Sequence, residues 1–89
     1  MEGSHWSPVK SARLKKTRGV SFEELLERGR FIEGRQHPSR LPQQIAPFEY
    51  QGYVWVVPYI IQGGERFLKT LYPSRKYTRL LRKGEAYET

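Results

Sequence analysis

The spacing of apolar and polar positions changes twice along this chain, and each change predicts a change of secondary structure. Up to Gly29 the apolar residues recur three and four positions apart, as they do on one face of a helix. From Phe31 to Tyr72 they alternate or form short β-branched and aromatic runs, which is typical of strands. Beyond Ser74 the helical spacing returns. The pattern predicts helices on both sides of a β-rich middle.

The first predicted helix is recognised mainly by its ends. Ser7 followed by Pro8 supplies a polar N-cap and a proline in the first helical position, and Gly19 lies beyond the expected end. The expected apolar face is thin and consists of Val9, Ala12 and Leu14. Five cations occupy the rest of the helix: Lys10, Arg13, Lys15, Lys16 and Arg18.

The second predicted helix has a stronger N-terminal signal. Ser21 and Glu24 are spaced as a capping box, in which each side chain accepts a backbone N–H left unpaired at the helix start. Val20 and Leu25 stand at the positions of a hydrophobic staple. Gly29 is expected to stop the helix.

Four strands are expected in the middle of the chain: residues 31–34, 44–50, 53–61 and 66–72. The dipeptide Gln51-Gly52 and the segment 62–65 predict tight turns, so consecutive strands should pair as hairpins. Pro47 predicts an edge position or a bulge, because proline cannot donate to a ladder. In the last strand the bulky residues do not share one face, which leaves its register open.

Ser74 is expected to cap a final helix that ends at Gly84, with Tyr77, Leu80 and Leu81 on its inner side. Residues 1–6 and 85–89 are expected to fray. The predicted fold class is α+β, in one domain of 89 residues: two N-terminal helices, an antiparallel meander of three to four strands and a C-terminal helix.

Composition narrows the partners of this domain. The net charge is +7 and the pI about 10.0, which favours an anionic partner. No apolar run is long enough to span a membrane, and the first residues lack the pattern of a secretory signal. Cysteine is absent, and His5 and His37 are far apart without ligand-spaced carboxylates. We therefore expect a cytoplasmic protein with no metal, no cofactor and no membrane association.

The most basic stretch is residues 66–83, which contains no acidic residue. Its cations are Arg66, Lys69, Arg75, Lys76, Arg79, Arg82 and Lys83. Tyr72 and Tyr77 lie between them. Guanidinium groups beside aromatic rings suit a phosphate backbone that carries exposed bases, so RNA is the expected partner.

Three segments share a pattern with known proteins: His-Trp-Ser-Pro-Val-Lys at residues 5–10, Thr-Arg-Gly-Val-Ser-Phe-Glu-Glu at 17–24 and Pro-Ser-Arg-Lys-Tyr-Thr at 73–78. They are similar to an aromatic Trp-Asp-x-x-Lys element, a Lys-His-Gly-Val-x-Phe-x-Glu run and a terminal Ser-Ala-Arg-x-Ala-Thr segment. In these segments the chain resembles the BrnT-type toxins of bacterial type II toxin–antitoxin systems, a branch of the RelE-like ribonucleases. The chain departs from this pattern at Ser7, Arg18 and Tyr77, which replace aspartate, histidine and alanine.

The resemblance implies a metal-independent endoribonuclease that is neutralised by a cognate DNA-binding antitoxin. The candidate catalytic residues are Arg75, Lys69, Tyr72 and His37. Arg75 and Lys69 would stabilise the phosphorane, Tyr72 would stack a base or donate a proton, and His37 is the candidate general base. The candidate RNA-binding residues are Lys76, Arg79, Tyr59, Arg40, Lys15, Lys16 and Arg18.

Each of these residues also has a plainer interpretation. The cations can be solvated surface charges, strand tyrosines commonly pack against neighbours, and Trp6 and Trp55 are expected in the core. Two other functions remain open: a non-catalytic module that binds RNA or DNA, and an adaptor whose basic helix binds an acidic protein.

Overall fold

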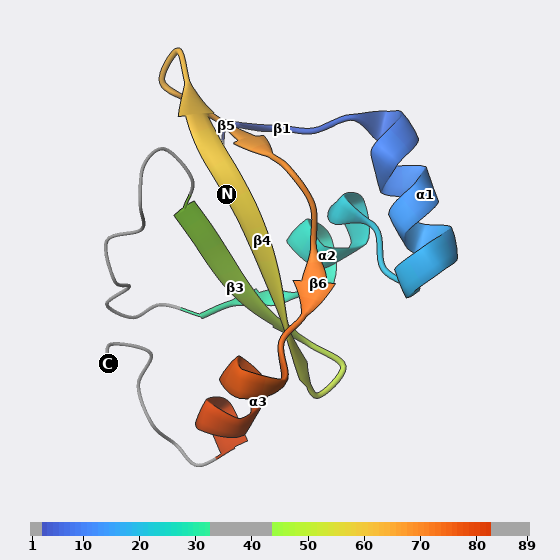
Figure 1. Ribbon diagram of the computed structural model, residues 1–89, viewed down its shortest axis with the longest axis vertical. Helices are drawn as coiled ribbons and strands as arrows, with labels where there is room; N and C mark the ends of the chain where they lie inside the picture. Colours follow the sequence, from blue (N-terminus) through green and yellow to red (C-terminus); the bar gives the residue numbers. More distant parts are fainter. Residues whose placement is uncertain (1–2, 33–43, 83–89) are drawn as a thin grey trace.

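The structure is a computed structural model that describes residues 3–32 and 44–82, and it confirms the predicted α+β class. The helices are α1 (Pro8–Arg18), α2 (Phe22–Arg28) and α3 (Arg75–Arg82). The strands are β1 (Ser4–His5), β2 (Arg30–Phe31), β3 (Gln44–Tyr50), β4 (Tyr53–Gln62), β5 (Glu65–Leu68) and β6 (Tyr72–Pro73). Figure 1 shows the central β3–β4 hairpin with helices around it.

The strands form one sheet in the order β1-β5-β4-β3-β2, and β6 pairs with β4 beside β5. The pairs β2–β3, β3–β4, β4–β5 and β4–β6 are antiparallel, as the predicted meander requires. Strand β1 is an addition, because Ser4 and His5 pair in parallel with Arg66 and Phe67 of β5. The expectation that residues 1–6 fray is therefore wrong for these two, and the sheet is mixed.

Two tight turns set the hairpin registers. Gln51 and Gly52 both have positive φ (54° and 77°), as do Gly63 and Gly64 (56° and 81°). Positive φ at both central residues is the geometry of a type I′ turn, whose twist matches that of the paired strands. The turns therefore place Tyr50 opposite Tyr53 and Gln62 opposite Glu65, as the sequence predicts.

The two faces of the sheet carry two separate cores, because side chains alternate along β4. On one face Val57 packs with residues of α1, α2, β3 and β5, and Trp55 and Tyr59 pack against this cluster. On the other face Val54 and Ile32 form a second cluster against α3. In Figure 1, α1 and α2 accordingly lie to one side of β4, and α3 lies near the β3–β4 turn.

Helix α1 buries only one of the three residues expected on its apolar face, Leu14, and adds Ser11. Ser11 and Leu14 are its buried positions, whereas Val9 is 70% exposed and Ala12 is also exposed. The hydroxyl of Ser11 accepts a hydrogen bond from the backbone N–H of Phe22 (3.0 Å), so this face meets the polar start of α2. A serine can satisfy that unpaired N–H, and an apolar residue cannot.

Pro47 lies neither in an edge strand nor at a bulge, because β3 is between β2 and β4 and pairs with β4 in an unbroken register. Its carbonyl accepts the backbone N–H of Ile32 (3.0 Å), directly after the last β2–β3 pair of Phe31 with Phe48. The proline nitrogen faces the same side, so the missing donor falls at the end of the β2–β3 ladder, where it costs least. None of the helices in the described part of the chain is long and apolar enough to cross a membrane.

Candidate functional site

A bulge separates β5 from β6 and decides which side chains point outward at the last strand. Leu68 pairs with Tyr59 and Tyr72 pairs with Val56, so this strand takes one more residue than β4 between the two pairs. The insertion lies opposite Pro58, which cannot donate to the ladder but accepts the N–H of Lys69 (2.8 Å).

The inserted residue explains why the sequence shows no single face in this strand. In an uninterrupted strand, Leu68 and Leu71 would point to opposite faces of the sheet. Because of the inserted residue, Leu71 is instead fully buried in the same core as Leu68. Tyr72 then follows on the opposite face and is 37% exposed. Lys69 is also exposed, and its ammonium lies 5.5 Å from the ring centroid of Phe67.

The start of α3 is anchored to β4 through backbone groups. The Ser74 N–H donates to the carbonyl of Val54 (2.8 Å), and the Ser74 hydroxyl accepts the N–H of Tyr77 (3.1 Å), which confirms the predicted cap. The buried hydroxyl of Thr78 accepts the N–H of Val54 (2.8 Å) and donates to the Ser74 carbonyl (2.6 Å). These bonds fix the direction in which the first turn of α3 leaves the sheet.

The cations that follow this anchor lack acidic partners. Arg75, Lys76 and Arg79 are exposed, and no ion pair joins them to an acidic group of residues 3–32 or 44–82. Tyr72 and Lys69 precede them in the chain, in β6 and in the bulge before it. We call these five residues the β6–α3 cluster. Positive charge that is not neutralised within the fold is available to an external anion.

The other predicted residues lie elsewhere. Lys15 and Lys16 are on α1, which packs on the sheet face opposite α3. The hydroxyl of Tyr59 donates to the side-chain oxygen of Gln44 (2.9 Å), toward the far end of β4. His37 and Arg40 lie outside the described residues. Five of the predicted residues therefore lie on one short segment, from Lys69 to Arg79, and the other described ones lie on α1 and β4.

Arg18 has a structural contact that the sequence did not predict. Its guanidinium donates to the main-chain carbonyl of Leu71, inside the bulge. The bulge frees this carbonyl from the ladder, and Arg18 satisfies it while joining the end of α1 to the start of β6. Arg18 is thus the cation of α1 that contacts the segment leading into β6.

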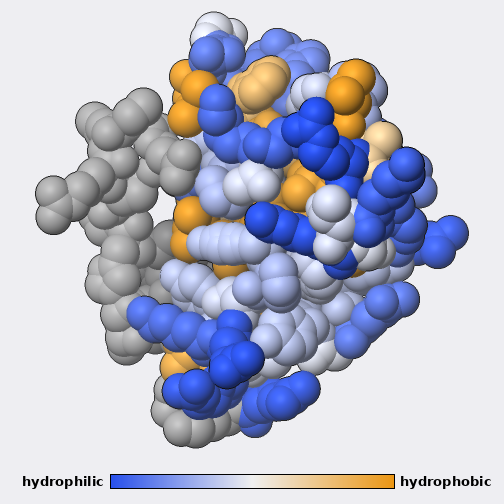
Figure 2. All heavy atoms as spheres, turned by 45° about the vertical axis from the view of Figure 1, so that its right-hand side comes forward, coloured by the Kyte–Doolittle hydropathy of each residue, from blue (hydrophilic) through white to orange (hydrophobic). Residues whose placement is uncertain are grey.

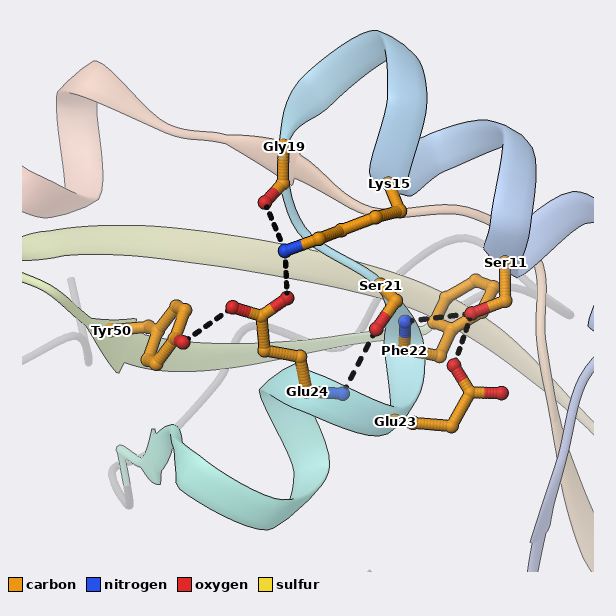
Figure 3. Close-up of polar contacts among 8 residues, drawn as sticks. All are labelled: Ser11, Lys15, Gly19, Ser21, Phe22, Glu23, Glu24 and Tyr50. Atoms are coloured by element: carbon orange, nitrogen blue, oxygen red, sulfur yellow. Dashed lines mark hydrogen bonds and ion pairs between the residues drawn. The ribbon is translucent and has the colours of Figure 1, made fainter.

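Glutamates hold α1, α2 and β3 together on the opposite face (Figure 3). Glu23 accepts hydrogen bonds from the hydroxyl of Ser11 (2.6 Å) and the indole N–H of Trp6 (2.9 Å). The bond from Ser11, followed by that from Trp6, lowers the pKa of the Glu23 carboxyl below its usual 4.5. This carboxylate therefore stays ionised near neutrality and serves the fold.

Glu24 makes a second set of contacts with the same consequence. It pairs with the ammonium of Lys15 (2.8 Å) and accepts a hydrogen bond from the phenol of Tyr50 (2.5 Å). The bond from Lys15 is the largest cause that lowers the pKa of Glu24. Its carboxylate in turn raises the pKa of Tyr50. Lys15 also donates to the carbonyl of Gly19 (3.2 Å), so its charge is already used within the fold.

An aromatic hollow of about 340 Å³ lies beside β6, and the sequence analysis missed it. It is lined by Tyr50, Gln51, Tyr53, Trp55 and Pro73. Trp55 packs against the core as expected, but it is only partly buried and also lines the hollow. The detectable signal was the alternation of Tyr53 and Trp55 beside a tight turn, opposite a strand that ends in proline.

Figure 2 shows the side of the molecule that lies to the right in Figure 1. Strongly hydrophilic side chains gather over α1 and over α3, and a paler band runs between them.

Within the described residues, no group of three or more histidine, cysteine or acidic side chains is placed to hold a metal ion. Comparisons of the chain with models of protein families, with curated proteins and with solved structures give no significant match.

Proposed function

We propose that this protein is a metal-independent endoribonuclease that cleaves mRNA in the cytoplasm and acts as the toxin of a type II toxin–antitoxin pair. The observation that carries the proposal is the β6–α3 cluster. Its four cations, together with Tyr72, lie within eleven consecutive residues without an acidic partner in the described part of the chain. Such a surface suits an RNA phosphate and its neighbouring base.

The proposed reaction uses the RNA itself as nucleophile. The ribose 2′ oxygen forms a bond to phosphorus while the bond to the 5′ oxygen breaks, leaving a 2′,3′-cyclic phosphate and a 5′-hydroxyl. Arg75 and Lys69 stabilise the charge that develops on the phosphorane. Tyr72 gives a proton to the departing 5′ oxygen. His37, the candidate base for the 2′-hydroxyl proton, lies outside the described residues.

The proposed antitoxin acts by covering the same surface. An acidic or apolar segment laid over the β6–α3 cluster would exclude RNA, and the net charge of +7 would speed the encounter. The contact is expected to involve Arg75, Lys76 and Arg79, because these cations lack acidic partners among the described residues.

Cleavage of end-labelled RNA in the presence of EDTA tests the activity. We expect new product bands with the wild-type protein and none when the RNA carries 2′-deoxyribose at the cleavage site. Arg75→Ala and Lys69→Ala should each lower the rate about 10²–10³-fold. Arg13→Ala, which removes an exposed cation of α1 that is not a candidate RNA-binding residue, is the matched control and should leave the rate unchanged.

Expression from a tightly controlled promoter tests the toxin role separately. We expect growth arrest with rapid loss of bulk mRNA, and relief of the arrest by Arg75→Ala. Normal growth with intact RNA, at an expression level confirmed by immunoblot, would count against the proposal.

One observation favours a second candidate, a non-catalytic module that binds RNA or DNA. His5 is the only histidine among the described residues, and its Nε2 lies 2.7 Å from the carboxylate of Glu65, at the opposite end of the sheet. Glu23 and Glu24 are engaged in the α1–α2 contacts. A salt-sensitive mobility shift without any cleavage would identify this function.

A further inference from the structure

The aromatic hollow has features that core packing does not require. Tyr53 and Trp55 are only partly buried, so each presents part of a ring to solvent. Pro73 pairs with Trp55 across the β4–β6 ladder and forms the opposite wall. Flat rings around an open hollow of about 340 Å³ are suited to a planar ligand that stacks.

The back of the hollow is held rigid by a hydrogen bond. The phenol of Tyr50 donates to Glu24 (2.5 Å), and Glu24 is in turn paired with Lys15. Tyr50 itself is largely buried, at 8% exposure. A ring fixed at both ends does not have to be ordered when a ligand arrives, which lowers the entropic cost of binding.

Strain is concentrated at the rim of the same hollow. Gln51 is the only non-glycine residue with positive φ (54°) in the described part of the chain. Type I′ turns favour asparagine, aspartate or glycine at this position, because these residues adopt positive φ with less strain than glutamine does. Its side chain lines the hollow and ends in an amide, which can donate and accept hydrogen bonds at a base edge.

Two cations are tied to the chain segment that contributes Pro73 to the hollow. Arg18 is bonded to the carbonyl of Leu71, two residues before Pro73, and Arg75 stands two residues after it. Arg28 lies close enough to Tyr50 to offset part of the rise in the pKa of its phenol that Glu24 causes. The occupant is therefore expected to carry negative charge next to a planar group.

We propose that this hollow binds one unpaired base of single-stranded RNA, which stacks on Tyr53 and Trp55 while the amide of Gln51 contacts its edge. This inference rests on the proposed function and specifies its substrate. Tyr72 lies on the other face of β6 from Pro73. An RNA strand that crosses the end of β6 thus places a base in the hollow and an adjacent phosphate at the β6–α3 cluster. Duplex RNA, whose bases are stacked on each other, cannot enter the hollow.

Fluorescence anisotropy with fluorescein-labelled hexanucleotides tests this site. The probes carry 2′-O-methyl groups, so their 2′ oxygen cannot attack and binding is measured without cleavage. Three probes are compared: a single strand, its duplex, and a strand of equal length with abasic units. We expect the single strand to bind at least about 10-fold more tightly than the abasic strand.

Two variants make the test specific. Tyr53→Ala should remove the preference for the single strand, a loss of about 10-fold, and leave abasic and duplex binding unchanged. Gln51→Asn keeps the turn and should reduce discrimination among bases at the occupied position. Phe31→Ala removes a different exposed aromatic ring (41% exposed) and should change no binding constant.

The outcomes separate this inference from the function on which it rests. If the abasic strand binds as tightly as the single strand, or if Tyr53→Ala preserves the preference, the hollow is not a base site although RNA binding stands. If no probe binds at low salt, both proposals fail. Should Tyr53→Ala not fold, as judged by circular dichroism, the comparison of Gln51→Asn with wild type decides the question.

Discussion

Helices α1 and α3 are both basic, but they lie against opposite faces of one sheet and differ in what surrounds their charges. Three glutamates of α2 lie near α1, and Glu24 pairs with Lys15. Helix α3 and the strand before it contain no acidic residue. A count of cations would give both helices the same role. The structure distinguishes them by placing the glutamates of α2 beside α1, whereas no ion pair joins Arg75, Lys76 or Arg79 to an acidic group of residues 3–32 or 44–82.

Charge reversal on each helix is the most direct way to break this comparison. Arg79→Glu should weaken binding of single-stranded 2′-O-methyl RNA by at least about 10-fold and reduce the slope of log affinity against log salt by about 1 or more. Lys16→Glu should have a much smaller effect, because Lys16 belongs neither to the β6–α3 cluster nor to the residues that line the aromatic hollow. Anisotropy titrations between low and moderate salt measure both. Equal losses for the two variants would remove the distinction.

The anchor of α3 should contribute the largest stability effect. Thr78→Val leaves the backbone N–H of Val54 without its partner in a buried site, which is expected to cost about 1–3 kcal/mol. Thr78→Ser keeps the hydroxyl and is the matched control. Urea unfolding followed by circular dichroism measures the difference, and near-identical midpoints for Thr78→Val and wild type would contradict the anchor.

The contact from Arg18 should have a smaller effect. Arg18→Ala removes the hydrogen bond to the carbonyl of Leu71, and since the side chain is largely exposed we expect a loss of about 1 kcal/mol. Arg13→Ala, on the same helix and also exposed, should leave the unfolding midpoint in place. A greater loss from Arg13→Ala than from Arg18→Ala would contradict the structural role of Arg18.

The α1–α2 contacts predict a mild dependence of stability on pH. Their hydrogen bonds lower the pKa of Glu23 and Glu24 below the usual 4.5. A carboxyl group whose pKa is lower in the folded state stabilises the fold above its unfolded pKa. That contribution is lost as the pH falls from about 4.5 through the lower folded value. Glu24→Gln should flatten the profile of melting temperature between pH 6 and pH 3, while Glu27→Gln, at an exposed position, should not.

Local signals explain how much of the fold was predictable. The N-caps at Ser7, Ser21 and Ser74 and the turn at Gln51-Gly52 depend on a few adjacent residues, and the structure places them as expected. The pairing of β1 with β5 joins residues about sixty positions apart, and no local pattern encodes it.

The candidate site was only partly predictable for the same reason. Arg75, Lys76 and Arg79 were visible as a basic run, because they are neighbours in sequence. The contact between Arg18 and Leu71, and the hollow that joins Tyr53 to Pro73, depend on tertiary packing. The bulge had one sequence signal, Pro58 in the middle of the most β-prone run, but its position follows only from the observed register.

The outer edge of β6 is closed to another strand by two features of the same short segment. First, the carbonyl of Leu71 already accepts a hydrogen bond from Arg18. Second, the Ser74 N–H points toward β4, so the backbone of the preceding residue, Pro73, faces away from β4, and proline has no N–H to offer on that side. An incoming peptide would find no N–H donor at Pro73, and the carbonyl of Leu71 is already used. A strand added at this border would lack two of the hydrogen bonds of a regular ladder, so a protein that covers this region is expected to engage side chains.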